Sequence, residues 1–362
     1  MQTQVNRLDF TGQNIYTGID VHKKDWRVSI YSKELYHKSF NQPPKPEVLY
    51  RYLNKHFPNG TYYSVYEAGY CGFWIHNQLQ SLGINSIVVN PADVPTTDKE
   101  KKQKSDPIDS NKLARQLRNG DLEAIYIHNR DMLEDRSLIR TRCTLVKEIT
   151  RYKNRIKAKL AFFGIEIPEG YNRNWGYWSN RFIEWLSELK FNQESGDESM
   201  KILVNHVKYL RKDLLEVNKK VRALSRNEYY NKRINLLLSI RGIGLITAMV
   251  ILTEIDDIHR FSNQEKLISY VGLTPTSHST GDKQVHGEMV NRGNKFLKKS
   301  IIEAAWIAAR VDPVLHMKYL GYCRRMKANK AIVRIAQKLL NRVSFVLKNE
   351  VPFNDDIEKY PI

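Results

Sequence analysis

The sequence predicts an α/β region at the N-terminus followed by two mainly helical regions. Three patterns support this: short apolar runs typical of strands come first, a heptad repeat follows, and glycine-interrupted apolar helices come last. The chain has 362 residues, more than the roughly 100–200 of one domain. We therefore expect an α/β domain at 1–128, a helical coiled-coil region at 129–232 and a helical domain at 233–362.

In the first region, short runs rich in Val, Ile and Tyr predict a mixed sheet flanked by helices. The expected strands are "NIYTGIDV", "DWRVSIYS", "TYYSVYEAG" and "INSIVVNP". Before the last of these, "GFWIHNQLQSLG" has helical spacing, and Gly83 suits the end of that helix. Strands first, followed by alternation of strand and helix, is typical of a mixed α/β sheet.

In the middle region, apolar residues recur in alternating steps of four and three, which predicts a long helix with one apolar face. The positions are Leu203, Val207, Leu210, Leu214, Val217, Val221 and Leu224. An earlier helix is expected to present a similar face, made by Leu145, Ile149, Tyr152, Ile156, Leu160 and Phe163. An antiparallel arm, a dimerising coiled coil and an ordinary intramolecular helical hairpin all fit this pattern.

The last region opens with "INLLLSIRGIGLITAMVILTEI", which predicts two helices joined by Gly-Ile-Gly. Backbone amides at the start of the second helix, together with its dipole, can hold a phosphate. The pattern is typical of helix-hairpin-helix segments that bind DNA without sequence preference. Glycines between helices also serve close packing, so both interpretations stand.

The charge of the chain indicates a polyanionic partner. Lys and Arg number 58 against 39 Asp and Glu, a net charge of +19. DNA or RNA fits this excess best, and an anionic membrane surface is the competing interpretation. We find no apolar run long enough to span a bilayer and no signal peptide, and the three cysteines form no metal-binding pair. A cytoplasmic protein is expected.

Four acidic residues occur in an order that suggests a metal site. Asp20 and Glu67 come at strand ends, and Asp106 and Asp109 open a helix after the last strand. Taken singly, each also fits an ordinary turn, strand end or helix start after Ser105. Together they have the order of a ribonuclease-H-type site, in which carboxylates hold two Mg²⁺ ions roughly 3.5–4 Å apart for phosphodiester chemistry.

A second cluster, "SHSTGDK", holds hydroxyl groups beside a glycine. Ser and Thr next to Gly often make only a turn. The functional alternative is a nucleophile on a flexible loop that attacks a phosphodiester and forms a covalent protein–DNA ester. His278 or the acidic site would then act as base. We expect His22 and His286 to be solvated or structural.

Seven blocks of the sequence, in order, resemble those of the insertion-sequence-110 family of transposases. They span residues from about 15 to about 348: "YTGIDVHKKDW", "YEAGYCGFW", "VVNPADV", "KSDPIDSNKLA", "LLLSIRGIGLITAMVILTEI", "FSNQEKLISYVGLTP" and "HGEMVNRGNKFLKKSIIEAAW". The resemblance implies a RuvC-like DEDD domain, a coiled-coil segment and a C-terminal transposase domain. It also implies that the DEDD carboxylates are Asp20, Glu67, Asp106 and Asp109.

The family's catalytic serine often directly precedes a glycine, and here the chain departs from the family. Thr280 occupies that place, and Ser279 comes one residue earlier. We favour Ser279 as nucleophile because a primary hydroxyl is less crowded than one on a β-branched side chain. A second departure is Arg241, where the family often has Pro before Gly-Ile-Gly; it adds a cation that suits a phosphate.

The resemblance implies an RNA-guided DNA recombinase. A structured bridge or seek RNA would pair with donor and target DNA, Mg²⁺ (with Mn²⁺ as an alternative) would bind the carboxylates, and a dimer or tetramer would act at the bacterial nucleoid without a membrane. Two alternatives remain open. One is a Holliday-junction resolvase or nuclease that uses water, and the other is a nucleic-acid-binding protein without catalysis.

Overall fold

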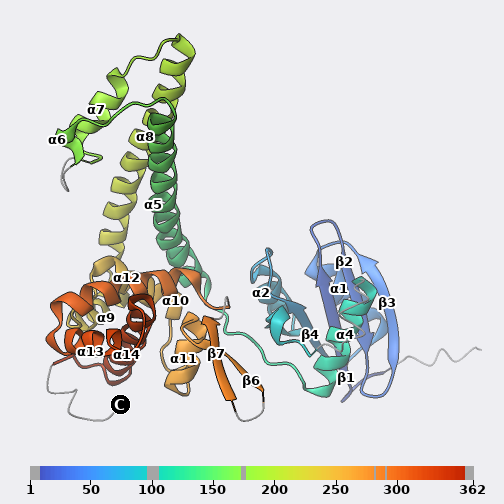
Figure 1. Cartoon of the computed structure of the whole chain (residues 1–362). Helices are drawn as coiled ribbons and strands as arrows, with labels where there is room; N and C mark the ends of the chain where they lie inside the picture. The colour runs from blue at the N-terminus through green and yellow to red at the C-terminus, as the bar shows by residue number, and fades with distance from the viewer. Residues whose placement is uncertain (1–8, 96–105, 173–176, 281–282, 290–291, 355–362) are drawn as a thin grey trace, which may run out of the picture. The chain divides into compact units, whose positions relative to one another are not determined.

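The chain divides into two compact units, residues 1–127 and 128–362. The computed structural model, drawn in Figure 1, describes residues 9–95, 106–172, 177–280, 283–289 and 292–354. Within these ranges, only the backbone is described for 106–108, 172, 275–280 and 283–289.

The first unit contains a five-stranded mixed sheet, as the sequence predicts. Its spatial order is β3-β2-β1-β4-β5, with β1 antiparallel to β2 and parallel to β4. The strands are β1 (Asn14–Val21), β2 (Trp26–Tyr31), β3 (Tyr36–Gln42), β4 (Thr61–Glu67) and β5 (Asn85–Val89). The order places β1, the first strand of the chain, at the centre of the sheet.

Helices cover both faces of this sheet. On one face, α1 (Pro46–His56) and α2 (Trp74–Ser81) pack their leucines against Ile19 and Val28 of the sheet. On the other face, α4 (Asp106–Asn119) packs Leu113 against β4 and β5, and the short helix η1 (Pro91–Asp93) follows β5. The sheet is therefore the middle layer of an α/β/α unit.

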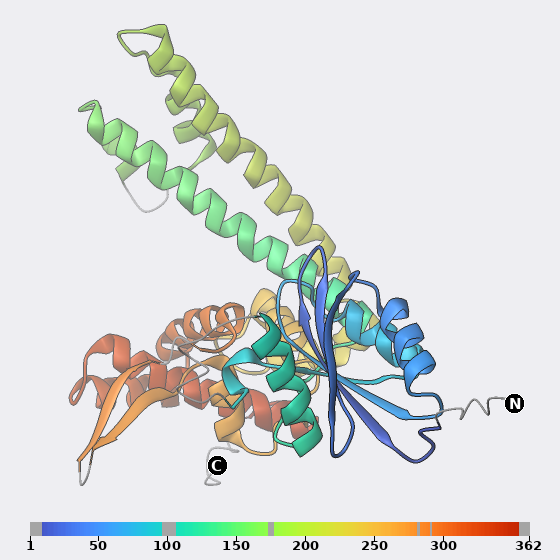
Figure 2. The same ribbon diagram turned by 90° about the vertical axis from the view of Figure 1, so that its right-hand side faces the viewer.

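In the second unit, two long helices form an arm. α5 (Arg130–Phe162) and α8 (Glu194–Leu224) pack along each other in opposite directions, as Figures 1 and 2 show. The short helices α6 (Glu169–Asn172) and α7 (Asn180–Glu188) connect them in the sequence and lie to one side of the outer part of the arm (Figure 1).

The predicted apolar face of α8 is confirmed, because all seven of its heptad positions are buried or half-buried. On α5, the predicted positions from Leu145 to Leu160 are likewise buried or half-buried. The prediction for Phe163 is wrong: this residue ends α5 instead of lying on its inner face, and it is 51% exposed.

The rest of the second unit is a helical body with one β-hairpin. Its largest core contains most of α10, which is buried throughout 248–255. The hairpin of β6 and β7 lies where the sequence suggested a flexible loop. The elements are α9 (Glu228–Leu238), α10 (Leu245–Ile255), α11 (Gln264–Val271), β6 (Pro275–Thr280), β7 (Lys283–Met289), α12 (Lys295–Val311), α13 (Pro313–Cys323) and α14 (Ala328–Asn349).

Among the described helices, none combines the length and the apolar character needed to cross a membrane. The long helices of the arm carry charged residues along their exposed faces.

Candidate active site at the end of the sheet

The helix α4 approaches β1 more closely than a side chain on β1 would allow. A Cβ atom on Gly18 would lie 2.2 Å from the backbone oxygen of Ser110 and 2.4 Å from the backbone nitrogen of Ala114. Only glycine lets a helix backbone come this near to a strand. The hydroxyls of Ser29 and Ser110 lie 2.9 Å apart and fix the same contact from β2.

The contacts of α4 also fix its direction across the sheet. Ser110, near its start, lies over Gly18, whereas Arg118, near its end, lies over the ring of Tyr31 at 5.1 Å. Tyr31 pairs with Tyr16, near the beginning of β1. The helix therefore runs opposite to β1, and its first turn lies toward the C-terminal end of that strand.

The ladder between β1 and β4 brings Asp20 and Glu67 to the same edge. The strands are parallel, and Ile19 stands opposite Tyr66, so the next residues on the two strands are Asp20 and Glu67. Neighbouring strands lie about 4.8 Å apart. The two acids predicted from separate runs thus end adjacent strands of one sheet.

Both acids share the sheet face that α4 covers. Asp20 comes two residues after Gly18, and Glu67 comes two residues after Val65, which packs with Leu113 of α4. Residues two apart on a strand lie on the same face. The sheet therefore presents Asp20 and Glu67 toward the side from which α4 begins.

The helix α4 begins at Asp106, and Asp109 follows one turn later. Asp109 is half-buried, whereas the side chain of Asp106 lies outside the described part of the structure. The Asp-x-x-Asp segment therefore begins near the sheet edge at which Asp20 and Glu67 end their strands. Joint coordination by Asp20, Glu67, Asp106 and Asp109 stays a prediction.

His22 belongs to this edge, although sequence reasoning assigned it no role there. Its Nε2 atom lies 3.2 Å from Oδ2 of Asp20, and its side chain is 47% exposed. Asp20 itself is only 23% exposed. The sequence signal was the spacing of two residues, which puts both side chains on one face at the strand end. His22 can therefore orient the Asp20 carboxylate.

The donor chemistry of this edge suits a hard divalent cation, which prefers carboxylate oxygens. Among the described side chains, however, no three His, Cys, Asp or Glu groups lie close enough to hold a metal ion. The side chain of Asp106 is not among those described. Asp20, Glu67 and Asp109 are described, and these three do not converge closely enough to hold an ion without a further ligand. Asp20 and Glu67, which end adjacent strands, are the nearest pair that the strand register gives for a candidate metal site.

The predicted nucleophiles lie at the end of β6. Ser279 pairs with Gln284 and Thr280 pairs with Lys283 in the backbone register of the hairpin. The expected flexible loop is therefore wrong for these two positions, which are strand. Their side chains lie outside the described part of the structure, so the choice between Ser279 and Thr280 stays open.

The hairpin root, defined here as Gly272, Arg292 and Gly293, is a tight backbone crossing. A Cβ atom on Gly272 would lie 2.5 Å from the backbone oxygen of Arg292, and one on Gly293 would lie 2.6 Å from Cα of Gly272. Both glycines have positive φ, +79° and +128°. Only glycine tolerates this combination of φ angle and contact.

A fully buried acid holds both ends of the hairpin root. Glu254 of α10 accepts hydrogen bonds from Arg140 Nε at 2.7 Å and Nη2 at 2.8 Å, and from Asn294 Nδ2 at 2.7 Å. The Tyr270 hydroxyl donates to the Glu254 backbone oxygen at 2.8 Å. Tyr270 precedes the hairpin and Asn294 follows it, so one network joins the arm, α10 and the hairpin.

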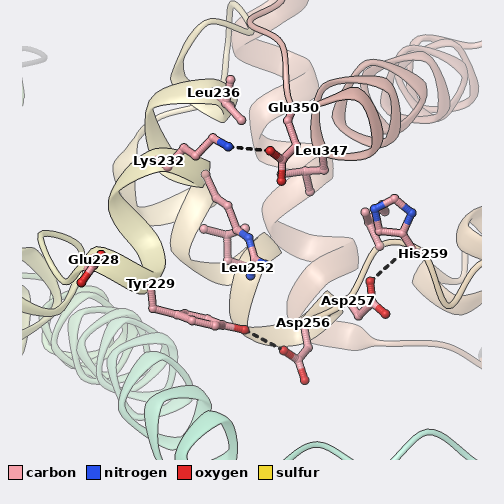
Figure 3. Close-up of a pocket in the computed structure, with 12 residues that line it drawn as sticks. Glu228, Tyr229, Lys232, Leu236, Leu252, Asp256, Asp257, His259, Leu347 and Glu350 are labelled. Carbon is pink, nitrogen blue, oxygen red and sulfur yellow. Dashed lines mark hydrogen bonds and ion pairs between the residues drawn. The ribbon is translucent and has the colours of Figure 1, made fainter.

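The second unit also has a cavity of about 210 Å³. Figure 3 shows the residues that line it, which include both acids and bases. There the Tyr229 hydroxyl donates to Asp256 Oδ1 at 3.2 Å, and His128 Nδ1 lies 3.1 Å from Asp256 Oδ2. Asp257 and Glu350 also line it. Its acids make it a poor site for a phosphate.

Comparison with known proteins agrees with this architecture. Residues 17–164 match the DEDD transposase family model of the IS110 group, described as "Transposase". Residues 234–320 match the model described as "Transposase IS116/IS110/IS902 family". The first match contains α4 and all of the sheet except the first residues of β1, and the second contains the hairpin.

Relatives that match over most of their length show the same likeness. The transposase for insertion sequence element IS1533 of Leptospira borgpetersenii is 26% identical over 300 residues, which cover 81% of this chain and 85% of that protein. The transposase for insertion sequence element IS1111A of Coxiella burnetii is 25% identical over 284 residues, 76% and 74% of the two chains. The chain therefore belongs to the IS110/IS116/IS902 transposase family and is a DNA-binding, strand-transferring enzyme.

Proposed function

We propose that this transposase is an RNA-guided DNA recombinase whose acidic edge and hairpin act on one phosphodiester. Asp20, Glu67, Asp106 and Asp109 would hold divalent ions, and Ser279 or Thr280 would be the nucleophile. The observation that carries the proposal is the β1–β4 register, which makes Asp20 and Glu67 neighbours at the edge where α4 begins.

A DEDD transposase domain implies use of a divalent metal, and we propose Mg²⁺, with Mn²⁺ as an alternative. Carboxylate oxygens on adjacent strand ends suit either ion. When bound, the ions would polarise the scissile phosphate and stabilise the leaving oxygen. The parallel pairing of β1 with β4 supports this assignment, because Asp20 and Glu67 follow paired residues at the ends of adjacent strands.

The hydroxyl of Ser279 or Thr280 would form a bond to phosphorus while the bond from phosphorus to a deoxyribose oxygen breaks. The hydroxyl proton would pass to His278 or a carboxylate, and the leaving oxygen would take up a proton in turn. The product is a covalent protein–DNA ester. Because the reverse reaction can use another deoxyribose hydroxyl, strands exchange without an added energy source.

We also propose that the segment between α9 and α10 contacts the DNA backbone as a helix-hairpin-helix-like element. Gly242 is required for packing, since a Cβ there would lie 2.7 Å from Cβ of Ala308. Gly244, at the N-cap of α10, has open space where a Cβ atom would lie, with nothing within 4 Å, and it provides no side-chain cap. The first amides of α10 are therefore suited to a phosphate.

Guidance by a bridge or seek RNA and assembly into a dimer or tetramer are also part of the proposal. The net charge of +19 supports a second polyanion besides DNA. The heptad face of α8 supports coiled-coil packing with α5, and the exposed Ile202, Tyr209 and Leu215 of α8 support contact with another subunit. We propose 1–128, 129–232 and 233–362 as domains, acting at the bacterial nucleoid in the cytoplasm.

The test is to trap the covalent intermediate. The chain, its copurified RNA and end-labelled donor and target DNA are incubated with Mg²⁺ and separated on a denaturing gel. We expect a labelled adduct with the unaltered chain. We expect it to disappear in one of the two variants Ser279→Ala and Thr280→Val, which then identifies the nucleophile. If both variants keep the adduct, the proposed nucleophiles are wrong. Cleavage without any adduct would favour a resolvase or nuclease that uses water.

A second experiment separates the enzyme from a binding protein without catalysis. Replacing both Asp20 and Asp106 by Ala is expected to abolish strand transfer while DNA binding persists, because the carboxylates are proposed to hold catalytic ions only. Unchanged strand transfer in this double variant would show that the acidic edge is not catalytic.

A further inference from the structure

We infer that one face of α5, at the base of the arm, is a binding site for a backbone phosphate of the DNA being exchanged. The site consists of Arg136, Ser137, Arg140, Thr141 and Thr144, and we call it the α5 phosphate site. The inference rests on the proposed function, because that function makes a DNA strand the source of the phosphate.

The five residues lie on one side of the helix and line one cavity. Their spacing of one, three, one and three positions follows the helical period. The cavity measures about 380 Å³, and Leu133 and Leu145 also line it. This volume falls in the range of roughly 300–1,000 Å³ typical of ligand sites.

Arg136 is the strongest hydrogen-bond donor that the cavity offers. The Thr141 hydroxyl already donates to the backbone oxygen of Ser137 at 2.9 Å, and the Thr144 hydroxyl donates to that of Arg140 at 3.1 Å. Arg140 directs two donors to Glu254. Within the described residues, no hydrogen bond or ion pair joins the Arg136 guanidinium to another group.

The electrostatic surroundings of Arg136 favour an added anion. Burial lowers the pKa of the Arg136 guanidinium below its usual value, and the like charge of Arg140 lowers this pKa further. Glu254 acts in the opposite direction, but its carboxylate already accepts two bonds from Arg140 and one from Asn294. A phosphate would supply the missing negative charge and match the planar fork of the guanidinium.

The position of the site links it to the proposed nucleophile. Arg140 lines the cavity and also binds Glu254, which holds Asn294 at the hairpin root. A phosphate on Arg136 would thus lie beside the network that supports the hairpin of β6 and β7. This neighbourhood favours a DNA strand over the guide RNA as the source of the phosphate.

The cavity in Figure 3 provides a contrast in the same unit. Its lining includes four acids, Glu228, Asp256, Asp257 and Glu350, which would repel a phosphate. The α5 phosphate site has no acid in its lining. Charge complementarity therefore selects the α5 site for a phosphodiester.

The test uses the full chain with its RNA and compares Arg136→Gln with Arg130→Gln. Arg130 lies on the same helix, is 85% exposed and pairs with Glu134, so its replacement removes an equal charge outside the cavity. Affinity for duplex DNA is measured across salt concentrations. For Arg136→Gln we expect the log–log salt slope to fall in magnitude by about 0.9, the contribution of one phosphate, and for Arg130→Gln we expect no such change.

Methylphosphonate substitution then locates the phosphate. A neutral linkage is placed at one DNA backbone position at a time, and binding to each DNA is measured. We expect one position where neutralisation weakens binding of the unaltered chain and of Arg130→Gln but not of Arg136→Gln. No such position, or the same loss in all three proteins, overturns the inference. We call this dependence of the loss on Arg136 the Arg136 coupling. If it appears only with methylphosphonate-substituted guide RNA, the assignment to DNA is wrong.

Stability distinguishes a binding role from a structural one. Without nucleic acid, Arg136→Gln is expected to match or exceed the Tm of the unaltered chain, because the removed charge lacks an ion-pair partner. A clear fall in Tm would show a structural role and contradict the inference. The adduct assay keeps the two proposals separate: Ser279-dependent adduct with no Arg136 coupling refutes only the phosphate site, and coupling without any adduct refutes only the proposed nucleophile.

Discussion

The acidic edge of the first unit and the hairpin of the second are held in place by different means. Asp20 and Glu67 lie in a five-stranded sheet, and a helix packs directly on that sheet at Gly18. The hairpin has two strands and is fixed at the hairpin root by crossing glycines and by Glu254. A two-stranded ribbon is only marginally stable by itself.

The two parts of the proposed active site should therefore respond differently to substitution. The carboxylates occupy positions set by strand register, so changing one of them should alter chemistry and leave the fold intact. The hairpin depends on one buried network, so a change there should alter both stability and activity.

The largest effect is expected from the carboxylates. Asp20→Asn or Glu67→Gln removes a charge that the proposal assigns to metal binding, and strand transfer should fall about a thousandfold. Denaturant unfolding of the first unit should change little, because both side chains sit at an edge of the sheet. Glu47→Gln, an exposed acid in the first turn of α1, is the control and should keep full activity. A loss of stability as large as the loss of activity would break the contrast.

The next effect is expected at the hairpin root. Glu254→Ala leaves Arg140 and Asn294 without their shared acceptor, and we expect a loss of about 3 kcal/mol in the free energy of unfolding. Urea titration measures it. Hydrogen exchange at the Asn294 amide, which bonds to the Tyr270 oxygen at 2.9 Å, should also become faster.

The matched control for Glu254→Ala is Glu303→Ala on α12, which removes only an exposed pair with Lys299 at 3.6 Å. It should cost less than about 0.5 kcal/mol. If Glu254→Ala behaved like this control, the hairpin would not depend on the buried network.

A smaller effect is expected where α4 contacts the sheet. Gly18→Ala places a Cβ atom 2.2 Å from the backbone of Ser110, so α4 must shift, at a cost of about 1–3 kcal/mol. Strand transfer should fall too, because the shift moves Asp106 and Asp109 away from the sheet edge. Gly170→Ala, where a Cβ meets nothing within 4 Å, should do neither. Unchanged activity in Gly18→Ala would show that the place of α4 is not critical.

The smallest effect that we expect is a pH dependence of stability in the second unit, which comes from Asp312. Burial raises the pKa of the Asp312 carboxyl, but hydrogen bonds from Arg342 and the Leu315 amide outweigh burial and hold this pKa below the usual 3.8. Asp312 thus stabilises the fold above pH 3.8, and this contribution declines as pH falls through the lowered native pKa. Urea unfolding between pH 5 and 3 should show this loss in the unaltered chain and not in Asp312→Asn. Equal acid sensitivity of both proteins would contradict it.

Strands with regular apolar alternation were predictable from the sequence, and polar strands were not. β1, β2, β4 and β5 follow their apolar runs, whereas β3, "YHKSFNQ", is an exposed polar edge strand without such a pattern. The hairpin of β6 and β7 was missed for a similar reason. Its one usable signal was Gly-Asp between two short runs, which is typical of a tight hairpin turn.

In the candidate site, too, some features could be predicted from the sequence and others only from the fold. The order of Asp20, Glu67, Asp106 and Asp109 was visible in the sequence, and the β1–β4 register supplies the neighbourhood of the first two. The pairing of Arg140 with Glu254 joins residues 114 positions apart, which no local pattern reveals. The sequence likewise could not show that the Arg136 guanidinium has no hydrogen-bond or ion-pair partner among the described residues, because this depends on the tertiary fold.

The most direct test of the central claim is a crystal structure of the chain with DNA and Mn²⁺, analysed by anomalous scattering. We expect an Mn²⁺ peak within coordination distance of carboxylate oxygens of both Asp20 and Glu67, with Asp106 or Asp109 completing the site. The peak should vanish in Asp20→Asn. An Mn²⁺ site elsewhere, or Asp20 and Glu67 without any bound ion, would contradict the account.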